Sequence, residues 1–159
     1  MKTFDVIALG ELNVDLILNR IAGFPEVGKE IFARDMICTL GSSTAIFAAN
    51  VSALGARTAF AGMIGRDAFG ELVRGSLEAR GVDTRYVIEA ADRATGVTVV
   101  MSYGEDRANV TYPGAMEALR FADLDPEIFL SARHIHLSSL FMQPGLLADI
   151  VPILRAAHD

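Results

Sequence analysis

Three things are scarce in this chain: cysteine, long apolar runs and clustered positive charge. The single cysteine, Cys38, excludes an internal disulfide and agrees with a reducing compartment. The apolar run near the N-terminus is too short for a signal peptide, and no run reaches the roughly 20 residues that span a bilayer. The 14 Lys and Arg are scattered through a chain of net charge −6, so nothing concentrates the potential that a nucleic acid requires. We therefore expect a cytoplasmic protein with neither a membrane nor a nucleic-acid partner.

What the chain does have is the composition of one globular domain. Its 159 residues are 52% hydrophobic and 21% charged, which is enough for a substantial core. Cys38 lies in the apolar stretch 36–38, and this predicts a buried, unreactive thiol.

Apolar strand patterns alternate with helical patterns along most of the chain. This alternation predicts an α/β fold of three layers, with a doubly wound, mainly parallel sheet. A glycine closes the first two predicted helices, and Pro152 is expected to kink the last one. The predicted strands are 4–9, 58–64, 86–89 and 134–138, and the predicted helices are 45–54, 68–80, a short one from 126 and 144–157.

Other β-rich segments do not fit this alternation. Residues 96–103 and 107–112 are joined by a Gly-Glu-Asp-Arg turn, which is a hairpin signal. Together with 14–18 and 30–40 they predict a small extra sheet that projects from the main one as a lid. Residues 153–159 keep a helical pattern without a following strand, so we expect a truncated fold.

The first polar cluster follows the first strand, where open α/β sheets bind ligands. In an extended segment Glu11, Asn13 and Asp15 project to one face, and a carboxylate beside an amide can bind neighbouring hydroxyls. A polar turn that only satisfies local backbone groups fits these residues equally well.

The second polar cluster, residues 41–44, opens the helix at 45–54. Free N–H groups at a helix start bind anions or hydroxyl oxygens, but taken alone this cluster is better explained by ordinary capping. No GxGxxG or P-loop spacing is present, which disfavours a nicotinamide-dependent dehydrogenase.

Isolated polar side chains elsewhere give weaker signals. His134 and His136 alternate on one strand but lack a third ligand with suitable spacing, so no metal site is expected. Arg107, at the base of the hairpin, could reach a charged substrate group, and a solvated hairpin charge is the simpler explanation.

Several motifs in one order resemble the ribokinase (PfkB) family of carbohydrate kinases, and the resemblance covers essentially the whole chain. The most characteristic run is Gly65-x-Asp67-x-x-Gly70, followed by Gly81-Val82-Asp83. The other motifs are Gly10-Glu11-x-Asn13-x-Asp15, the helix from Gly41 to Gly55, Thr95-Gly96-Val97, the hairpin 104–107 and Gly114-Ala115.

The resemblance implies a ribokinase-like, Rossmann-like fold and transfer of the ATP γ-phosphoryl group to a sugar hydroxyl. It implies that Asn13 and Asp15 hold sugar hydroxyls, that the backbone of Gly41, Ser42 and Ser43 approaches the sugar, and that Arg107 and Ser138 complete the substrate site. Mg-ATP is the implied cofactor, with a monovalent cation as an optional activator. Lid strands of this kind close over substrate and often form a dimer contact.

The resemblance implies that the catalytic base and the ATP pocket lie in a C-terminal half, which we expect to be missing from these 159 residues. We therefore expect no catalytic residue in this chain and no kinase activity from it alone. The family commonly has a second glycine in place of Ser42 and a sugar-contacting Asn in place of Ile46. A nucleoside kinase of the same fold, and a non-catalytic sugar-binding or regulatory module, are the alternatives.

Overall fold

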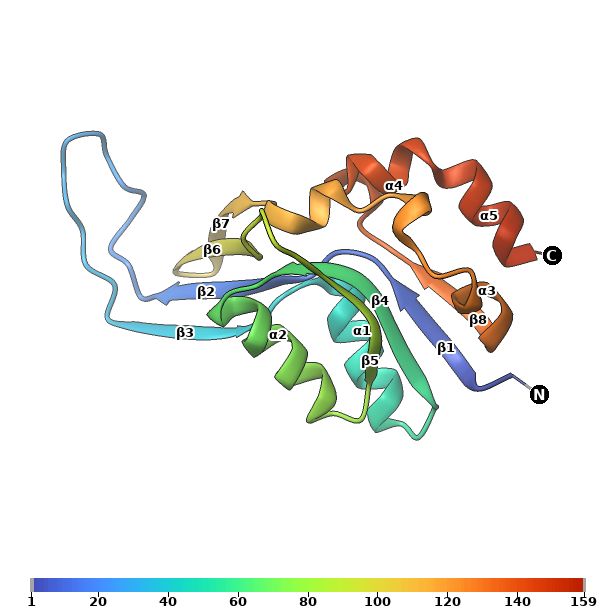
Figure 1. The fold of residues 1–159 in the computed structure, drawn as a ribbon. Coiled ribbons are helices and arrows are strands. Elements are labelled where there is room, and N and C mark those ends of the chain that lie inside the picture. The colour runs from blue at the N-terminus through green and yellow to red at the C-terminus, as the bar shows by residue number, and fades with distance from the viewer. Residues whose placement is uncertain (1, 159) are drawn as a thin grey trace.

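Two four-stranded sheets organise the computed structural model, which describes residues 2–158. The main sheet has the order β5-β4-β1-β8, and all of its neighbouring strands are parallel. The second sheet, β3-β2-β6-β7, extends away from the first and is called the lid here (Figure 1). The strands are β1 Phe4–Leu9, β2 Asn13–Asn19, β3 Asp35–Leu40, β4 Thr58–Gly65, β5 Asp83–Ala90, β6 Gly96–Tyr103, β7 Asp106–Tyr112 and β8 Ala132–Leu137.

Helices cover both faces of the main sheet, so the predicted three-layer α/β architecture is confirmed (Figure 1). The helices α1 Ser43–Ala53 and α2 Ala68–Glu78 pack on one face. The other face carries α3 Glu127–Ser131, α4 Pro144–Ala148, α5 Ile150–His158 and the 3₁₀ turns η1 Gly114–Ala118, η2 Phe121–Asp123 and η3 Leu140–Met142.

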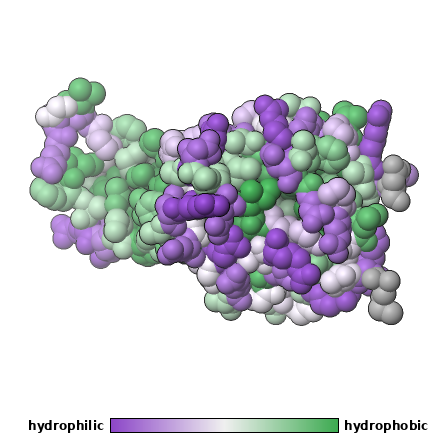
Figure 2. Space-filling view, in the orientation of Figure 1, coloured by the Kyte–Doolittle hydropathy of each residue, from purple (hydrophilic) through white to green (hydrophobic). Residues whose placement is uncertain are grey.

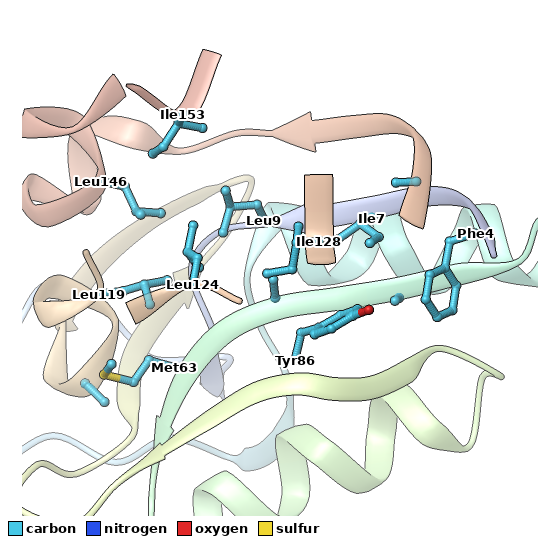
Figure 3. Packing of buried hydrophobic residues seen from close by; sticks show 14 residues of the cluster. Phe4, Ile7, Leu9, Met63, Tyr86, Leu119, Leu124, Ile128, Leu146 and Ile153 are labelled. Carbon is cyan, nitrogen blue, oxygen red and sulfur yellow. The ribbon is translucent and has the colours of Figure 1, made fainter. Parts of the chain in front are cut away.

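The core is divided by the main sheet into two apolar clusters. Ile7 and Leu9 of β1 pack with Leu146 and Ile153 on the α4–α5 side (Figure 3), while Ala8 faces the α1–α2 side. A central parallel strand is buried on both faces, and this explains the near-continuous apolar pattern of β1. Phe60 lies on the α1–α2 side and is fully buried.

The lid is joined to the main domain through the loops that follow β1 and β5 and through the chain that leads from β3 into α1 and from β7 into η1. Its β2 runs parallel to β6 and antiparallel to β3, and β6 and β7 form a hairpin whose turn contains Gly104 at φ 59°. The strand predicted over residues 30–40 is shorter than expected. It is β3, which begins at Asp35, and residues 30–34 lie in the loop before it.

Two local predictions are wrong. The C-terminal helix is not kinked at Pro152, because the chain breaks at Asp149 and Pro152 falls in the first turn of α5, where its missing N–H needs no partner. Cys38 is exposed rather than buried, because it lies in the lid, whose apolar outer face packs into the α1–α2 cluster at its base, through Val14 and Leu40, while Cys38 lies further out. Within residues 2–158, no helix has the length and apolarity needed to cross a membrane.

Candidate substrate cleft

The loop after β1 carries the chain directly into β2 and so brings Asn13 and Asp15 to the carboxyl end of the main sheet. Asn13 is almost fully buried, and its Nδ2 donates to Asp15 Oδ1 at 3.0 Å and to Thr98 Oγ1 of β6 at 3.1 Å. The two donated bonds fix the amide orientation and hold the Asp15 carboxylate in place.

A cleft of about 410 Å³ opens between the lid and the start of α1, and it is the size of a small-molecule site. The lid contributes one wall, the α1 start a second, and the loop after β8 a third. The lining residues are Glu11, Asn13, Asp15, Ser42, Ser43, Ile46, Thr98, Val100, Arg107, Asn109, Thr111, Ser139 and Met142. Five of the predicted site residues, namely Asn13, Asp15, Ser42, Ser43 and Arg107, are therefore brought together.

Gly41 lies against the Asn13–Asp15 pair. A Cβ built at Gly41 would overlap the Asp15 carboxylate and would come within 2.5 Å of Asn13 Nδ2. Only glycine leaves room for both side chains here, so the requirement is a steric one and not a matter of turn geometry.

The Asp15 carboxyl has a raised pKa. Burial beside the cleft is the main cause, and it is opposed by the hydrogen bond from Asn13 and by the charge of Arg107. A partly desolvated carboxylate forms stronger hydrogen bonds to a ligand than one in bulk water, because fewer waters compete.

Glu11 borders the cleft but is almost fully buried, and its carboxylate is bonded within the protein instead of being presented to the ligand face as expected. Its Oε1 accepts from Ser43 Oγ at 3.0 Å and from the Thr44 backbone N–H at 3.3 Å, and its Oε2 accepts from Thr44 Oγ1 at 2.5 Å and from Gln143 Nε2 at 3.4 Å. Glu11 therefore joins the α1 start to the loop after β8.

Ser42 occupies a strained backbone position, with φ 69°. Its hydroxyl donates to the Glu11 carbonyl at 2.7 Å and accepts from the Ala45 N–H at 2.9 Å, so it caps α1. The Ile46 N–H is also bonded, to the Ser42 carbonyl. The N–H groups of Thr44, Ala45 and Ile46 are therefore already satisfied within the protein, and the prediction for the backbone of Ser42 and Ser43 stays a prediction.

Arg107 faces the cleft from β7 together with Asn109 and Thr111, as the alternation of a strand requires. Thr111 Oγ1 lies 3.0 Å from Thr98 Oγ1, which links the hairpin to the Asn13 side of the cleft. Ser138 lies behind the wall, with its Oγ 2.7 Å from Thr44 Oγ1, and its neighbour Ser139 lines the cleft instead.

The Gly65-x-Asp67-x-x-Gly70 run anchors the lid and lies outside the cleft. Asp67 Oδ1 accepts from the Gly70 N–H at 2.8 Å to cap α2, and it also accepts from Thr95 Oγ1 at 2.8 Å. Its Oδ2 accepts from the Thr95 N–H at 2.8 Å, just before β6 begins. Burial alone would raise the pKa of Asp67, but the hydrogen bonds from Thr95 and Gly70 outweigh it and lower that pKa.

His136 of β8 has a packing role in this structure, whereas His134 is exposed. His136 stacks on Phe47 of α1 with 3.6 Å between ring centroids, and burial, with His134 nearby, lowers the pKa of His136 despite the opposing charge of Glu11. Over the described range 2–158, no group of three or more His, Cys, Asp and Glu side chains could hold a metal ion.

The sequence analysis missed six lining residues, namely Thr98, Val100, Asn109, Thr111, Ser139 and Met142. The alternation of Arg107, Asn109 and Thr111 was a usable signal, because it places three polar side chains on one face of a predicted strand. Ser139 and Met142 gave no signal, since they lie in irregular chain whose path depends on Gln143 and Glu11.

The family model for "pfkB family carbohydrate kinase" matches residues 3–158, and the chain belongs to this family. A nucleoside kinase of Methanothermobacter thermautotrophicus is 29% identical over 136 residues, which is 85% of this chain and 44% of that protein. A protein of Arabidopsis thaliana named "Probable fructokinase-3" is 36% identical over 122 residues, or 74% of this chain and 33% of that protein.

The crystal structure of a fructokinase with bound ATP from Xylella fastidiosa has the same fold. It superposes with a TM-score of 0.80 at 23% identity, covering 99% of this chain and 49% of that one. The chain thus spans half or less of the length of these relatives.

Proposed function

We propose that this chain is the sugar-binding half of a carbohydrate kinase that, when complete, transfers the γ-phosphoryl group of ATP to a sugar hydroxyl. The observation that carries the proposal is the convergence of Asn13 and Asp15 on one cleft beneath the lid, with Gly41 packed against both side chains. A carboxylate held by an amide suits the adjacent hydroxyls of a sugar, and the lid strands supply a wall that can exclude water. The backbone around Gly41, Ser42 and Ser43 forms the opposite wall.

The use of ATP is proposed on different grounds from the binding of a sugar. Within residues 2–158 no group of three or more His, Cys, Asp and Glu side chains could hold a metal ion, so Mg²⁺ and a monovalent cation are proposed from family membership alone. ATP use is proposed from family membership, with an ATP-bound fructokinase as the structural neighbour. Phosphoryl transfer depends on positioning and charge stabilisation around the phosphates, so the 159-residue chain alone is expected to be inactive. Sugar-dependent ATP consumption by the pure chain in a coupled assay would contradict this.

A nucleoside is the second candidate substrate, because part of the cleft is apolar. Ile46, Val100 and Met142 line it, and they give a base more to pack against than a simple sugar could use. The nucleoside kinase among the relatives supports the same alternative. A binding site without catalysis is the third, and phosphorylation by the complete enzyme would exclude it.

We further propose that the complete protein dimerises through the lid. Register places Leu16, Leu18, Cys38, Met36 and Val110 on the lid face that points away from the cleft. Met36 is 63% exposed and Val110 60%, and apolar surface gathers over this part of the molecule (Figure 2). Analytical ultracentrifugation of wild type and Val110→Asp tests the interface, since a dimer that persists in the variant would contradict it.

Isothermal titration calorimetry with D-fructose, D-ribose and adenosine tests the substrate proposal. Asp15→Asn should weaken binding of the preferred ligand at least about tenfold, because the amide presents donors where the carboxylate presented acceptors. Asp92→Asn, at an exposed aspartate outside the cleft, is the matched control and should bind like wild type. Equal affinities of the Asp15→Asn protein and wild type would contradict the assignment of this cleft.

A further inference from the structure

Two pairs of hydroxyl groups converge on the buried Glu11 carboxylate. Ser43 Oγ donates to Oε1 and lies 2.7 Å from Ser139 Oγ. Thr44 Oγ1 donates to Oε2 and lies 2.7 Å from Ser138 Oγ. Each carboxylate oxygen therefore begins a short chain of two hydroxyls.

Counting protons fixes the direction of both chains, because a hydroxyl has one proton and a carboxylate has none to give. Ser43 gives its proton to Glu11, so Ser139 must be the donor in the Ser43–Ser139 contact. By the same reasoning Ser138 donates to Thr44. The carboxylate thus uses the protons of all four hydroxyls within the protein wall.

Gln143 supports this assignment from the other side of the loop. Its Nε2 faces three acceptors, namely Glu11 Oε2, the Ser138 carbonyl at 3.1 Å and the Ser139 carbonyl at 3.3 Å. Its Oε1 is fully buried without a partner among the described residues, although an acceptor of that kind would take any spare hydroxyl proton within reach. The region behind the wall has more acceptors than donors.

We propose that the cleft wall formed by the Ser43 and Ser139 hydroxyls presents acceptors only, so that it selects a ligand whose O–H or N–H groups point at it. The proposal rests on the function proposed above and narrows its substrate class to a donor-rich, neutral polyol at this wall. Both hydroxyls line the cleft, and with their protons directed inward only their lone pairs face it.

The same geometry disfavours carboxylates, phosphates and keto oxygens at this wall. The oxygen lone pairs of such a ligand group would face the lone pairs of the Ser43 and Ser139 hydroxyls, so no hydrogen bond could form. In a partly dry cleft, an oxygen without a hydrogen bond lowers the affinity of the ligand. The positive end of α1 is partly neutralised, because the Glu11 carboxylate already lies at it and accepts the Thr44 N–H. Arg107 offers donors only on the opposite wall, on β7.

Deoxy and deoxyfluoro analogues test the proposal, since fluorine keeps the polarity of a hydroxyl but cannot donate. The parent is whichever of D-fructose, D-ribose and adenosine binds in an Asp15-dependent manner. In wild type, replacing the hydroxyl at the wall by hydrogen or by fluorine should each cost about five- to tenfold in affinity by calorimetry. Ser139→Ala should lower the affinity for the parent ligand by a similar factor and should leave the affinities for the deoxy and deoxyfluoro analogues unchanged.

Ser43→Ala tests the direction of the Ser139 hydroxyl proton more directly than Ser139→Ala does. Ser43 is exposed, so we expect the variant to fold. Without Ser43 Oγ, the Ser139 proton is released and can turn into the cleft. The fluoro analogue should then bind several-fold better than the deoxy analogue, whereas in wild type the two are equal.

Three results are distinguishable. A parent sugar that binds while its fluoro analogues bind equally well at every position would overturn the acceptor wall and leave the proposed function standing. Equal fluoro and deoxy affinities in the Ser43→Ala protein would also overturn it. If none of the three parents shows Asp15-dependent binding, the proposed function itself fails.

Discussion

Asn13 Nδ2 donates to Asp15 Oδ1 at 3.0 Å across the face of β2 that lines the cleft, and Gly41 lies against both side chains. This contact turns three residues that differ in chemical type into one unit. The amide fixes the carboxylate, and the absent side chain at 41 gives them space. Predictions about ligand binding therefore begin here.

Gly41→Ala should weaken sugar binding at least about tenfold while costing about 1–3 kcal/mol of folding stability, since the new methyl group must displace Asp15 or Asn13. Chemical denaturation and calorimetry give the two quantities. Gly75→Ala is the matched control, because that glycine is exposed in α2 with nothing near its Cβ position. It should raise stability by about 0.5–1 kcal/mol and leave binding unchanged. Equal binding by the two variants would contradict the steric requirement.

Ser42 combines backbone strain with a helix cap, so its two smallest replacements should differ. Ser42→Ala keeps the positive φ and loses the bonds to Ala45 N–H and the Glu11 carbonyl, and should destabilise the fold by about 1–2 kcal/mol. Ser42→Gly loses the same bonds but relieves the strain, and should cost less than about 0.5 kcal/mol. Urea denaturation measures both. A glycine variant that is less stable than the alanine variant would show that strain at 42 is unimportant.

Asp67 is expected to hold the lid strand through Thr95 as well as capping α2. Asp67→Ala should cost about 1–2 kcal/mol in denaturation and should increase amide hydrogen exchange in β6 more than in β4. Because the folded pKa of Asp67 is lowered, its contribution is present above the ordinary value of 3.8 and is lost as the pH falls through the lowered value. In the Asp67→Ala protein, the free energy of unfolding should therefore fall less steeply at acid pH than in wild type. Unchanged exchange in β6 would contradict the anchoring role.

Sugar binding should depend on pH through Asp15. Its pKa is raised by burial, so protonation of the carboxylate, and with it the loss of affinity, should begin at a higher pH than an ordinary aspartate value of 3.8 gives. Asp15→Asn should show a flat profile over the same range. It should also be more stable than wild type at neutral pH, because the buried charge is removed. Calorimetric titrations across the pH range, on folded protein, check this, and equally pH-dependent binding by the Asp15→Asn variant would argue against Asp15 as the titrating group.

The sequence was informative where local chemistry decides the structure. The buried β1, the Asp67 cap, the hairpin around Gly104 and the polar face of Asn13 and Asp15 all follow from periodicity or turn chemistry. The family resemblance was likewise visible in the ordered glycine and aspartate motifs.

The sequence was uninformative where the burial or the conformation of a segment depends on other parts of the chain. Cys38 has an apolar neighbourhood in the sequence, but apolar residues signal burial only if another layer is present. Pro152 breaks a helix only in its interior, and the break at Asp149 moved it into a first turn. The inward position of Glu11 depends on Gln143, which is 132 residues away.

A crystal structure of the chain with the sugar selected by calorimetry tests the central claim most directly. We expect sugar hydroxyls within hydrogen-bond distance of Asp15 and Asn13, below the lid and beside Gly41. A sugar bound elsewhere, with the Asn13–Asp15 pair untouched, would contradict the claim.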